Sequence, residues 1–123
     1  MKSKKKMINP AVLQGFRDLE VDGAQDFVKD YFTAFLSPIS DRLLKLEKAI
    51  QDQDYRQLRD QAHALNSSFS TTGVEGMASI CARLEFLGNS SSIEGAAEKC
   101  KLLTQLHEEL RVEVLNLPEM KAK

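Results

Sequence analysis

The sequence predicts an all-α protein, an antiparallel four-helix bundle with a short additional helix at its N-terminus. Apolar residues recur three or four positions apart along most of the 123 residues, while glycine and proline are sparse, at 6 and 3. No stretch of useful length alternates polar and apolar residues as a strand would. Long amphipathic segments joined by short loops are typical of antiparallel bundles.

The first helix is expected to begin at Asn9-Pro10. The Asn9 side chain can cap the helix, and Pro10 occupies the first helical position, where no N–H donor is needed. Its apolar residues follow at helical spacing: Val12, Leu13, Phe16 and Leu19. The helix should end near Glu20.

The second helical segment begins near residue 24 with a dense apolar stripe and meets Ser37-Pro38. Proline lacks the backbone donor and clashes with the preceding turn, so we expect a kink or a break there. The pattern resumes at Ile39 and closes at residues 51–53.

Three further helices complete the bundle. Asp54 can cap the next helix, and Gly73 can end it in the left-handed conformation. The apolar stripe of this helix consists of Tyr55, Leu58, Ala62, Leu65, Phe69 and Thr72. A helix is then expected over residues 74–87, a loop over 88–92 and a last helix over 93–117, before Pro118.

The length of 123 residues suits a single domain. We place the domain at residues 8–118, with a disordered basic tail at 1–7 and a polar tail at 119–123. The basic run at residues 2–6 lacks interleaved aromatics, so a solubilising tail is favoured over a polyanion-binding one.

The net charge of −1 gives no strong field for nucleic acid or an acidic membrane. No apolar stretch approaches the ~20 residues of a membrane span. Met7-Ile8 runs directly into Asn9-Pro10, which argues against a secretory signal. A cytoplasmic location is therefore expected.

Cys81 and Cys100 lie outside any metal-ligand spacing. They are interpreted as two buried free thiols. A disulfide across two antiparallel helices remains the alternative.

The two histidines differ in their surroundings. His107 follows Leu106 among polar residues and is interpreted as an ordinary surface residue. His63 points about 130° away from the centre of its helix's apolar stripe, so it should face solvent. Asn66, Ser67 and Ser70, at i+3, i+4 and i+7, are short and polar. The charged residues Arg59 and Asp60 lie at i−4 and i−3, where they can reach the surface of a partner.

An exposed imidazole with small neighbours can be approached closely by a large partner. Direct transfer between two macromolecules requires this, because the reacting atoms must come within ~3–3.5 Å. Neutral imidazole is also nucleophilic. From these arguments alone, however, a single exposed histidine is more often an ordinary surface residue.

Residues 62–73, AHALNSSFSTTG, resemble the signature of histidine phosphotransfer (HPt) domains, A-H-x-L-K-G-S followed by about four residues and a glycine. The downstream residues that resemble the family's L-x-x-x-C-x-x-L-E-x-x-G pattern are Met77, Cys81, Leu84, Glu85 and Gly88. Residues 27–54 are similar to the family's long helix with its aromatic stripe. The resemblance covers about residues 8–117.

The resemblance implies that His63 accepts a phosphoryl group from a receiver-domain aspartate and passes it to another receiver. The partners would be receiver domains of response regulators or hybrid histidine kinases. The protein would be a carrier without kinase activity, cofactor or metal of its own, and Mg²⁺ would belong to the receiver. The sequence agrees in having no phosphate-cradling glycine-rich loop.

Two positions depart from the family pattern. The family lysine at i+3 is Asn66, which can offer only a neutral hydrogen bond to the phosphoryl group. The family glycine at i+4 is Ser67. We expect transfer to be retained, at a reduced rate.

Other residues are assigned supporting roles. Glu85 is expected on the helix next to His63, where it either holds the second ring nitrogen or is a solvated surface residue. The partner-binding surface is expected to include Arg59 and Asp60, with help from Leu13 and Phe16 of the first helix. The protein is expected to be a monomer.

A helical bundle could also serve two other functions. A non-catalytic helical adaptor would bind receivers without carrying phosphate. A di-metal carboxylate bundle would need inward-facing Glu residues with ExxH spacing, and the inward positions here are apolar.

Overall fold

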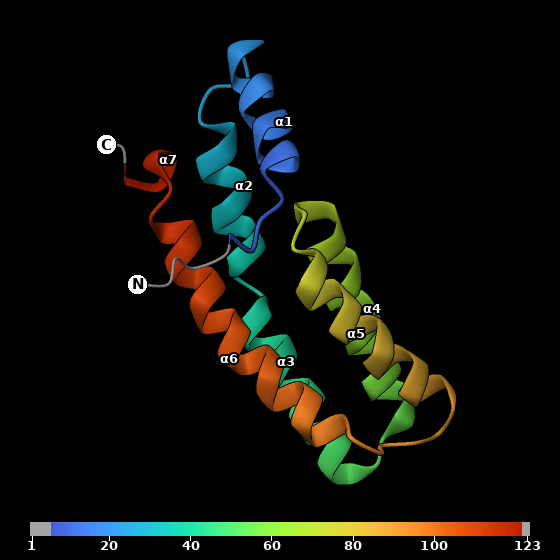
Figure 1. Cartoon of the computed structure of the whole chain (residues 1–123). Coiled ribbons are helices and arrows are strands. Elements are labelled where there is room, and N and C mark those ends of the chain that lie inside the picture. The colour runs from blue at the N-terminus through green and yellow to red at the C-terminus, as the bar shows by residue number, and fades with distance from the viewer. Residues whose placement is uncertain (1–5, 122–123) are drawn as a thin grey trace.

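The computed structural model describes residues 6–121, and every regular element in that range is a helix. The helices are α1 (Pro10–Val21), α2 (Phe27–Leu36), α3 (Ile39–Asp52), α4 (Tyr55–Thr72), α5 (Glu75–Asn89), α6 (Ala96–Leu115) and α7 (Pro118–Lys121). Successive long helices run in opposite directions: α3 to α6 form the bundle, and α1 and α2 pack together at one end (Figure 1). The predicted fold class is confirmed.

The Ser37-Pro38 dipeptide divides a long helical segment into two. The second helix ends at Leu36 and the third begins at Ile39, so a break rather than a kink separates them. Pro38 lacks an N–H and cannot continue the hydrogen-bond ladder of α2. α3 therefore follows α2 along one side of the molecule (Figure 1).

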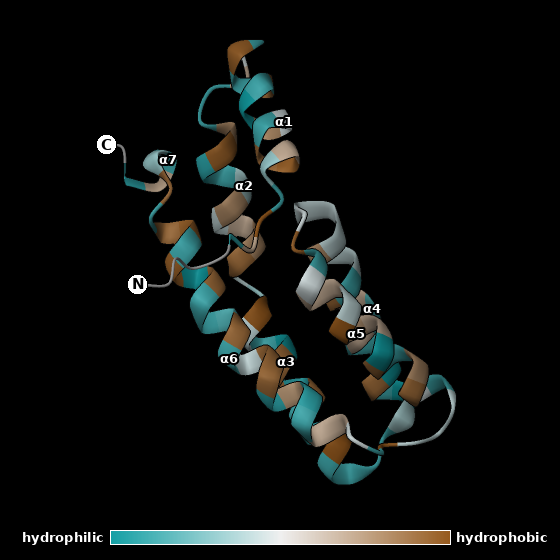
Figure 2. Cartoon of the chain, in the orientation of Figure 1, coloured by the Kyte–Doolittle hydropathy of each residue, from teal (hydrophilic) through white to brown (hydrophobic). Residues whose placement is uncertain are grey.

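The core is almost wholly apolar, and each long helix combines hydrophobic and hydrophilic residues (Figure 2). The largest fully buried side chains include Phe32, Phe69, Leu46, Leu58, Leu65, Met77, Leu84, Leu103 and Leu110. Among the described residues, the buried polar one is Thr72. Its hydroxyl donates to the Ser68 carbonyl at 2.8 Å and lies 2.7 Å from the Tyr31 hydroxyl. The buried hydroxyl of Thr72 therefore has hydrogen-bond partners within the protein.

The first helix has no fully buried residue, and its aromatic side chain packs against α2. The Phe16 ring packs against the rings of Phe27, Tyr31 and Phe32 in α2, with centroids 5.8, 4.5 and 6.0 Å away. Such aromatic pairs add about 0.5–1.5 kcal/mol each beyond area burial. The α1–α2 pair is therefore an aromatic extension of the bundle.

The bundle extends beyond the predicted domain limits of 8 and 118. The backbone N–H of Met7 donates to Glu113 Oε1 at 2.9 Å, so this residue is bound to α6 rather than free in a tail. Residues 118–121 form a short helix, in which Glu119 accepts hydrogen bonds from Arg17 and Met120 packs on the core. The remainder of the predicted tails, residues 1–5 and 122–123, lies outside the described residues.

The predicted loop between the last two long helices is shifted toward the C-terminus. The fifth helix continues to Asn89, so Gly88 lies inside a helix and not in the loop. The sixth begins at Ala96 and not at residue 93, because Gly95 before it adopts a left-handed conformation with φ of 75°. Local composition favoured a loop at Gly88, but packing against α4 keeps it helical.

None of the helices in residues 6–121 combines the length and apolar character needed to cross a bilayer.

Candidate functional site

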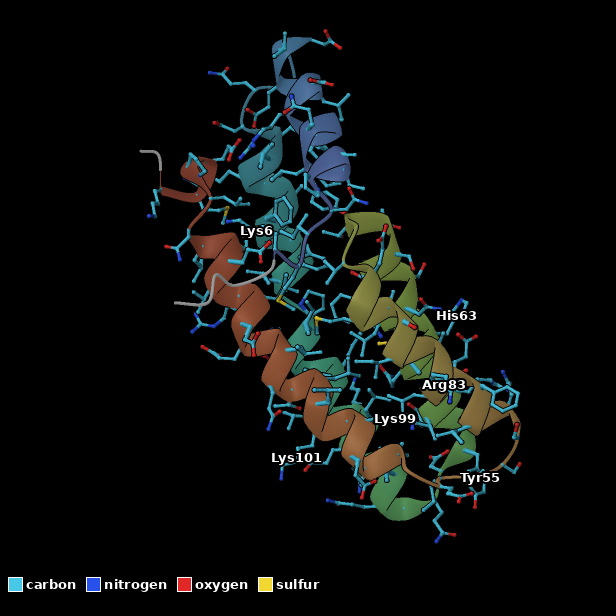
Figure 3. All side chains as sticks on the ribbon, in the orientation of Figure 1. Lys6, Tyr55, His63, Arg83, Lys99 and Lys101 are labelled. Carbon is cyan, nitrogen blue, oxygen red and sulfur yellow. The ribbon has the colours of Figure 1, made fainter. Side chains whose placement is uncertain are left out.

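His63 lies near the middle of α4, a helix that is defined at both ends. Asp54 caps its N-terminus by accepting a hydrogen bond from the Gln57 backbone at 3.1 Å. Gly73 ends it in the left-handed conformation, with φ of 78°. Because the apolar stripe turns Leu65 and its neighbours inward, His63 is left on the outer face with 69% of its side chain exposed (Figure 3).

A close approach of α5 to α4 sets the surroundings of His63. A Cβ atom built on Gly88 would lie 2.7 Å from the backbone nitrogen of Arg59 and 2.9 Å from its Cα. Any larger residue would push the two helices apart, so glycine permits this contact. Glu85 lies one turn before Gly88 in α5, and His63 lies one turn after Arg59 in the antiparallel α4. The same close approach therefore brings Glu85 opposite His63.

Glu85 forms a hydrogen bond with the imidazole. Its Oε2 lies 3.0 Å from Nδ1 of His63, and its side chain is 25% exposed. An ionised carboxylate only accepts hydrogen bonds, so Nδ1 must carry the proton. In the neutral ring this leaves Nε2 with the lone pair, and Nε2 makes no hydrogen bond to any described residue.

Polar side chains continue along α4 on the C-terminal side of His63. Asn66 is half-buried, and Ser67 and Ser70 are exposed. The Ser70 hydroxyl donates to Asn66 Oδ1 at 3.1 Å, which leaves the Asn66 amide N–H groups available for another acceptor. The side of the imidazole that faces this segment therefore carries no bulky side chain.

On the other side of His63, Arg59 and Asp60 form an ion pair, with Nε and Oδ1 3.0 Å apart. With His63 and Glu85, they line an open hollow of about 390 Å³. The structure thus brings Arg59, Asp60, His63 and Glu85 together on one face of α4 and α5.

A protein-family model, the Hpt domain, matches residues 30–113, which include His63 and Glu85. This chain belongs to the Hpt domain family. Its fold is similar to the crystal structure of histidine-containing phosphotransfer protein B (HptB) from Pseudomonas aeruginosa PAO1, with a TM-score of 0.84 and 18% identity. That likeness covers 98% of this chain and 100% of the HptB chain. No curated protein matches the sequence.

Within this Hpt domain, two of the predicted partner-binding residues are placed elsewhere. Phe16 packs into the α1–α2 aromatic group, and Leu13 is half-buried against the core. Neighbouring Val12 lies against the end of α4, where a Cβ on Gly73 would come 2.9 Å from it. The contacts that hold α1 are therefore at the end of the bundle, and none of them joins Leu13 or Phe16 to the group around His63.

The second histidine of the Hpt domain is not the surface residue that was predicted. His107 is half-buried in α6. Burial lowers its pKa below 6.5, and the nearby Glu108 carboxylate opposes that effect only in part. Its position after core Leu106 among polar residues had predicted a surface residue, but the structure buries part of its side chain.

Both cysteines are buried and free, as the favoured interpretation predicted. Burial raises the pKa of the Cys81 thiol to about 12 and also raises that of Cys100. A protonated thiol is a poor nucleophile, so neither is a candidate reactive group. Among residues 6–121, no three or more His, Cys, Asp or Glu side chains gather as a metal site would require.

Sequence reasoning missed two residues near the site. Gly88 was assigned to a loop, although its spacing from Glu85 in the family pattern was a signal of its place on the same helix. Phe86 was not considered, and it is 67% exposed. Its apolar side chain falls outside the stripe of α5, which identifies it as an exposed aromatic.

Proposed function

We propose that this protein is a phosphorelay carrier that accepts a phosphoryl group from a receiver-domain aspartate on His63 and passes it to another receiver. The observation that carries the proposal is the hydrogen bond between Nδ1 of His63 and Glu85, which leaves Nε2 exposed as the nucleophile. Membership of the Hpt family supports the same function.

In the proposed step, the Nε2 lone pair attacks the phosphorus of the aspartyl phosphate. The N–P bond forms as the bond from phosphorus to the aspartate oxygen breaks, and the carboxylate leaves with that electron pair. Nδ1 keeps its proton, so the phosphorylated ring is positively charged. The Glu85 carboxylate then stabilises that charge through a charge-assisted hydrogen bond. Transfer to the next receiver is the reverse reaction with a different aspartate.

The open surface around His63 favours transfer between proteins. Phosphoryl transfer needs in-line positioning of donor and acceptor, and a bulky neighbour would prevent a receiver from bringing its aspartate close enough. The exposed hydroxyl of Ser67 and the amide of Asn66 can donate to phosphoryl oxygens. We propose that the carrier acts as a cytoplasmic monomer without cofactor or kinase activity of its own, with Mg²⁺ held by the receiver.

A second function, an adaptor that binds receivers without carrying phosphate, is favoured by one observation. Asn66 stands where the family pattern has lysine, so no cation follows His63 by one turn to neutralise an incoming phosphoryl group.

Incubation with phosphorylated receiver domains distinguishes the two functions. The carrier predicts transfer of radiolabel to the wild-type protein and none to His63→Gln. His107→Gln is the matched control, because it removes the other of the two histidines and should keep its label. Binding of receivers without any labelling of the wild type would establish the adaptor.

A further inference from the structure

Phe86 is an exposed aromatic residue next to the phosphoryl-acceptor site. Its relative exposure is 67%, and among the described residues its ring pairs with no other aromatic. The other exposed large apolar residues lie on α1, α3 and α6: Leu19, Val21, Leu44, Leu102, Val112 and Leu115. Phe86 is therefore the large exposed apolar side chain of the α4–α5 pair.

The position of Phe86 follows from its neighbour Glu85. Adjacent Cα atoms are about 3.8 Å apart, and Glu85 is hydrogen-bonded to His63. Successive residues of a helix are about 100° apart, so Phe86 projects to the side of Glu85 that faces away from α4. Ala82 lies one turn before it and is exposed, so no large side chain shields the ring on that side.

A protein that reaches His63 must cover this part of α5. A contact that buries about 600 Å² on each partner, at the small end of specific interfaces, corresponds to a disc of roughly 14 Å radius. Such a disc centred on His63 includes the neighbours of Glu85. Exposed aromatic residues that become buried at the centre of an interface commonly dominate its binding energy.

Charged side chains on the far side of Phe86 indicate the chemistry of the partner. Phe86 borders a hollow of about 530 Å³ between α5 and the start of α6, which Arg83, Glu94 and Lys99 also line. Arg83 and Lys99 extend from α5 and α6 in the same region (Figure 3). Two cations against one carboxylate favour a partner whose docking edge is acidic.

We propose that Phe86 is the apolar anchor of receiver docking: a receiver domain that delivers a phosphoryl group to His63 buries the Phe86 ring and places acidic residues against Arg83 and Lys99. The inference rests on the proposed carrier function. It adds a residue that determines the affinity for the receiver but takes no part in the chemistry at Nε2.

The test separates chemistry from docking by using two phosphodonors. Phosphoramidate is a small donor that needs no protein interface: its P–N bond breaks as the Nε2–P bond forms, and ammonia leaves. The second donor is a phosphorylated receiver domain that labels the wild type, chosen from a panel of receivers of the same proteome. The variants are Phe86→Ala and, as matched control, Leu44→Ala, which removes a side chain of similar exposure, 64%, from a hollow between α3 and α6.

Phe86→Ala should be labelled by phosphoramidate at the wild-type rate and should keep the wild-type unfolding midpoint. With the receiver, it should need a concentration about tenfold higher or more for half-maximal transfer, the loss typical of an interface anchor. Leu44→Ala should match the wild type with both donors. As a separate variant, the charge reversal Arg83→Glu should also weaken transfer from the receiver. That transfer should then be less sensitive to salt than transfer to the wild type.

The outcomes separate the two proposals. Equal receiver transfer by Phe86→Ala and wild type overturns the docking inference and leaves the carrier function standing. Absence of His63 labelling by both donors, across the whole receiver panel, overturns the carrier function and the inference with it. If sedimentation shows a wild-type dimer that Phe86→Ala dissociates while receiver transfer is unchanged, the ring belongs to a contact between two copies of this chain and the receiver inference is wrong.

Discussion

Gly88 of α5 lies directly over the backbone of Arg59 in α4, at a separation that leaves no room for a side-chain carbon. This contact determines how closely the two helices pack. It also places Glu85, one turn away, within 3.0 Å of His63. A packing requirement and the geometry of the candidate site are therefore connected through one glycine.

Gly88→Ala should destabilise the protein. Alanine normally gains about 1 kcal/mol over glycine inside a helix, but a Cβ 2.7 Å from the Arg59 nitrogen forces the helices apart. Overpacking of this kind costs about 1–3 kcal/mol, so we expect a net loss in urea unfolding and slower labelling of His63. Gly76→Ala in the same helix is the control, because its Cβ would meet nothing within 4 Å and should leave stability equal or higher. A Gly88→Ala variant as stable as Gly76→Ala would show that the contact is not tight in solution.

Glu85→Gln should slow phosphorylation of His63 without unfolding the bundle. Glutamine can still accept from Nδ1, but it lacks the charge that stabilises the phosphorylated ring. Charge-assisted hydrogen bonds are about twice as strong as neutral ones, so we expect a loss of roughly tenfold or less in the rate. Phosphoramidate labelling followed over time measures the rate directly. Glu98→Gln, an exposed residue on α6, is the comparison, and equal rates in both variants would reduce Glu85 to a solvated surface residue.

Asn66→Lys should accelerate labelling of His63. It restores a cation one turn from the imidazole, where the incoming phosphoryl group brings negative charge. We expect an increase of a few-fold, largest at low salt because screening weakens the attraction. Asn66→Gln, which lengthens the side chain without charge, is the matched control. An unchanged or lower rate for the lysine variant would mean that the hydrogen bond from Ser70 to Asn66 matters more than charge at this position.

His107 should make stability fall as the solution becomes more acidic. Burial lowers the pKa of His107 in the folded protein below the value of 6.5 that it has when exposed. Between the two values the unfolded chain binds a proton that the folded chain does not, so the free energy of unfolding decreases as pH falls through this window. Below the folded pKa the loss is complete and no further decrease arises from this group.

Urea unfolding of wild type and His107→Gln at about pH 7.5 and about pH 5.5 measures this effect. The wild type should lose more stability between the two conditions than the variant, because carboxylates contribute equally to both. A smaller pH dependence in the wild type than in His107→Gln would show that the folded state favours the protonated ring.

The helical period explains what could be predicted from local sequence. Spacing of three and four along α4 turned Leu58, Leu65 and Phe69 inward, and the same rotation exposed His63. Pro38 predicted the break between α2 and α3, because its missing N–H acts within a single turn. These features depend on residues close together in the chain.

Contacts between distant segments explain what was missed. The composition of residues 88–92 is typical of a loop, and only the proximity of Arg59 reveals that Gly88 serves close helix packing. The short helix Pro118–Lys121 likewise contacts a distant part of the chain, because Glu119 binds Arg17 of α1.

The sequence by itself determined the all-α class, the main helices and the exposed histidine, because each follows from the 3.6-residue turn and from local capping or proline chemistry. Only the tertiary structure decided that Glu85 meets Nδ1 and that Phe16 turns toward α2. These features depend on the distance and register between two packed helices. Side-chain volumes on both helices set that distance and register, and the apolar period of a single helix does not encode them.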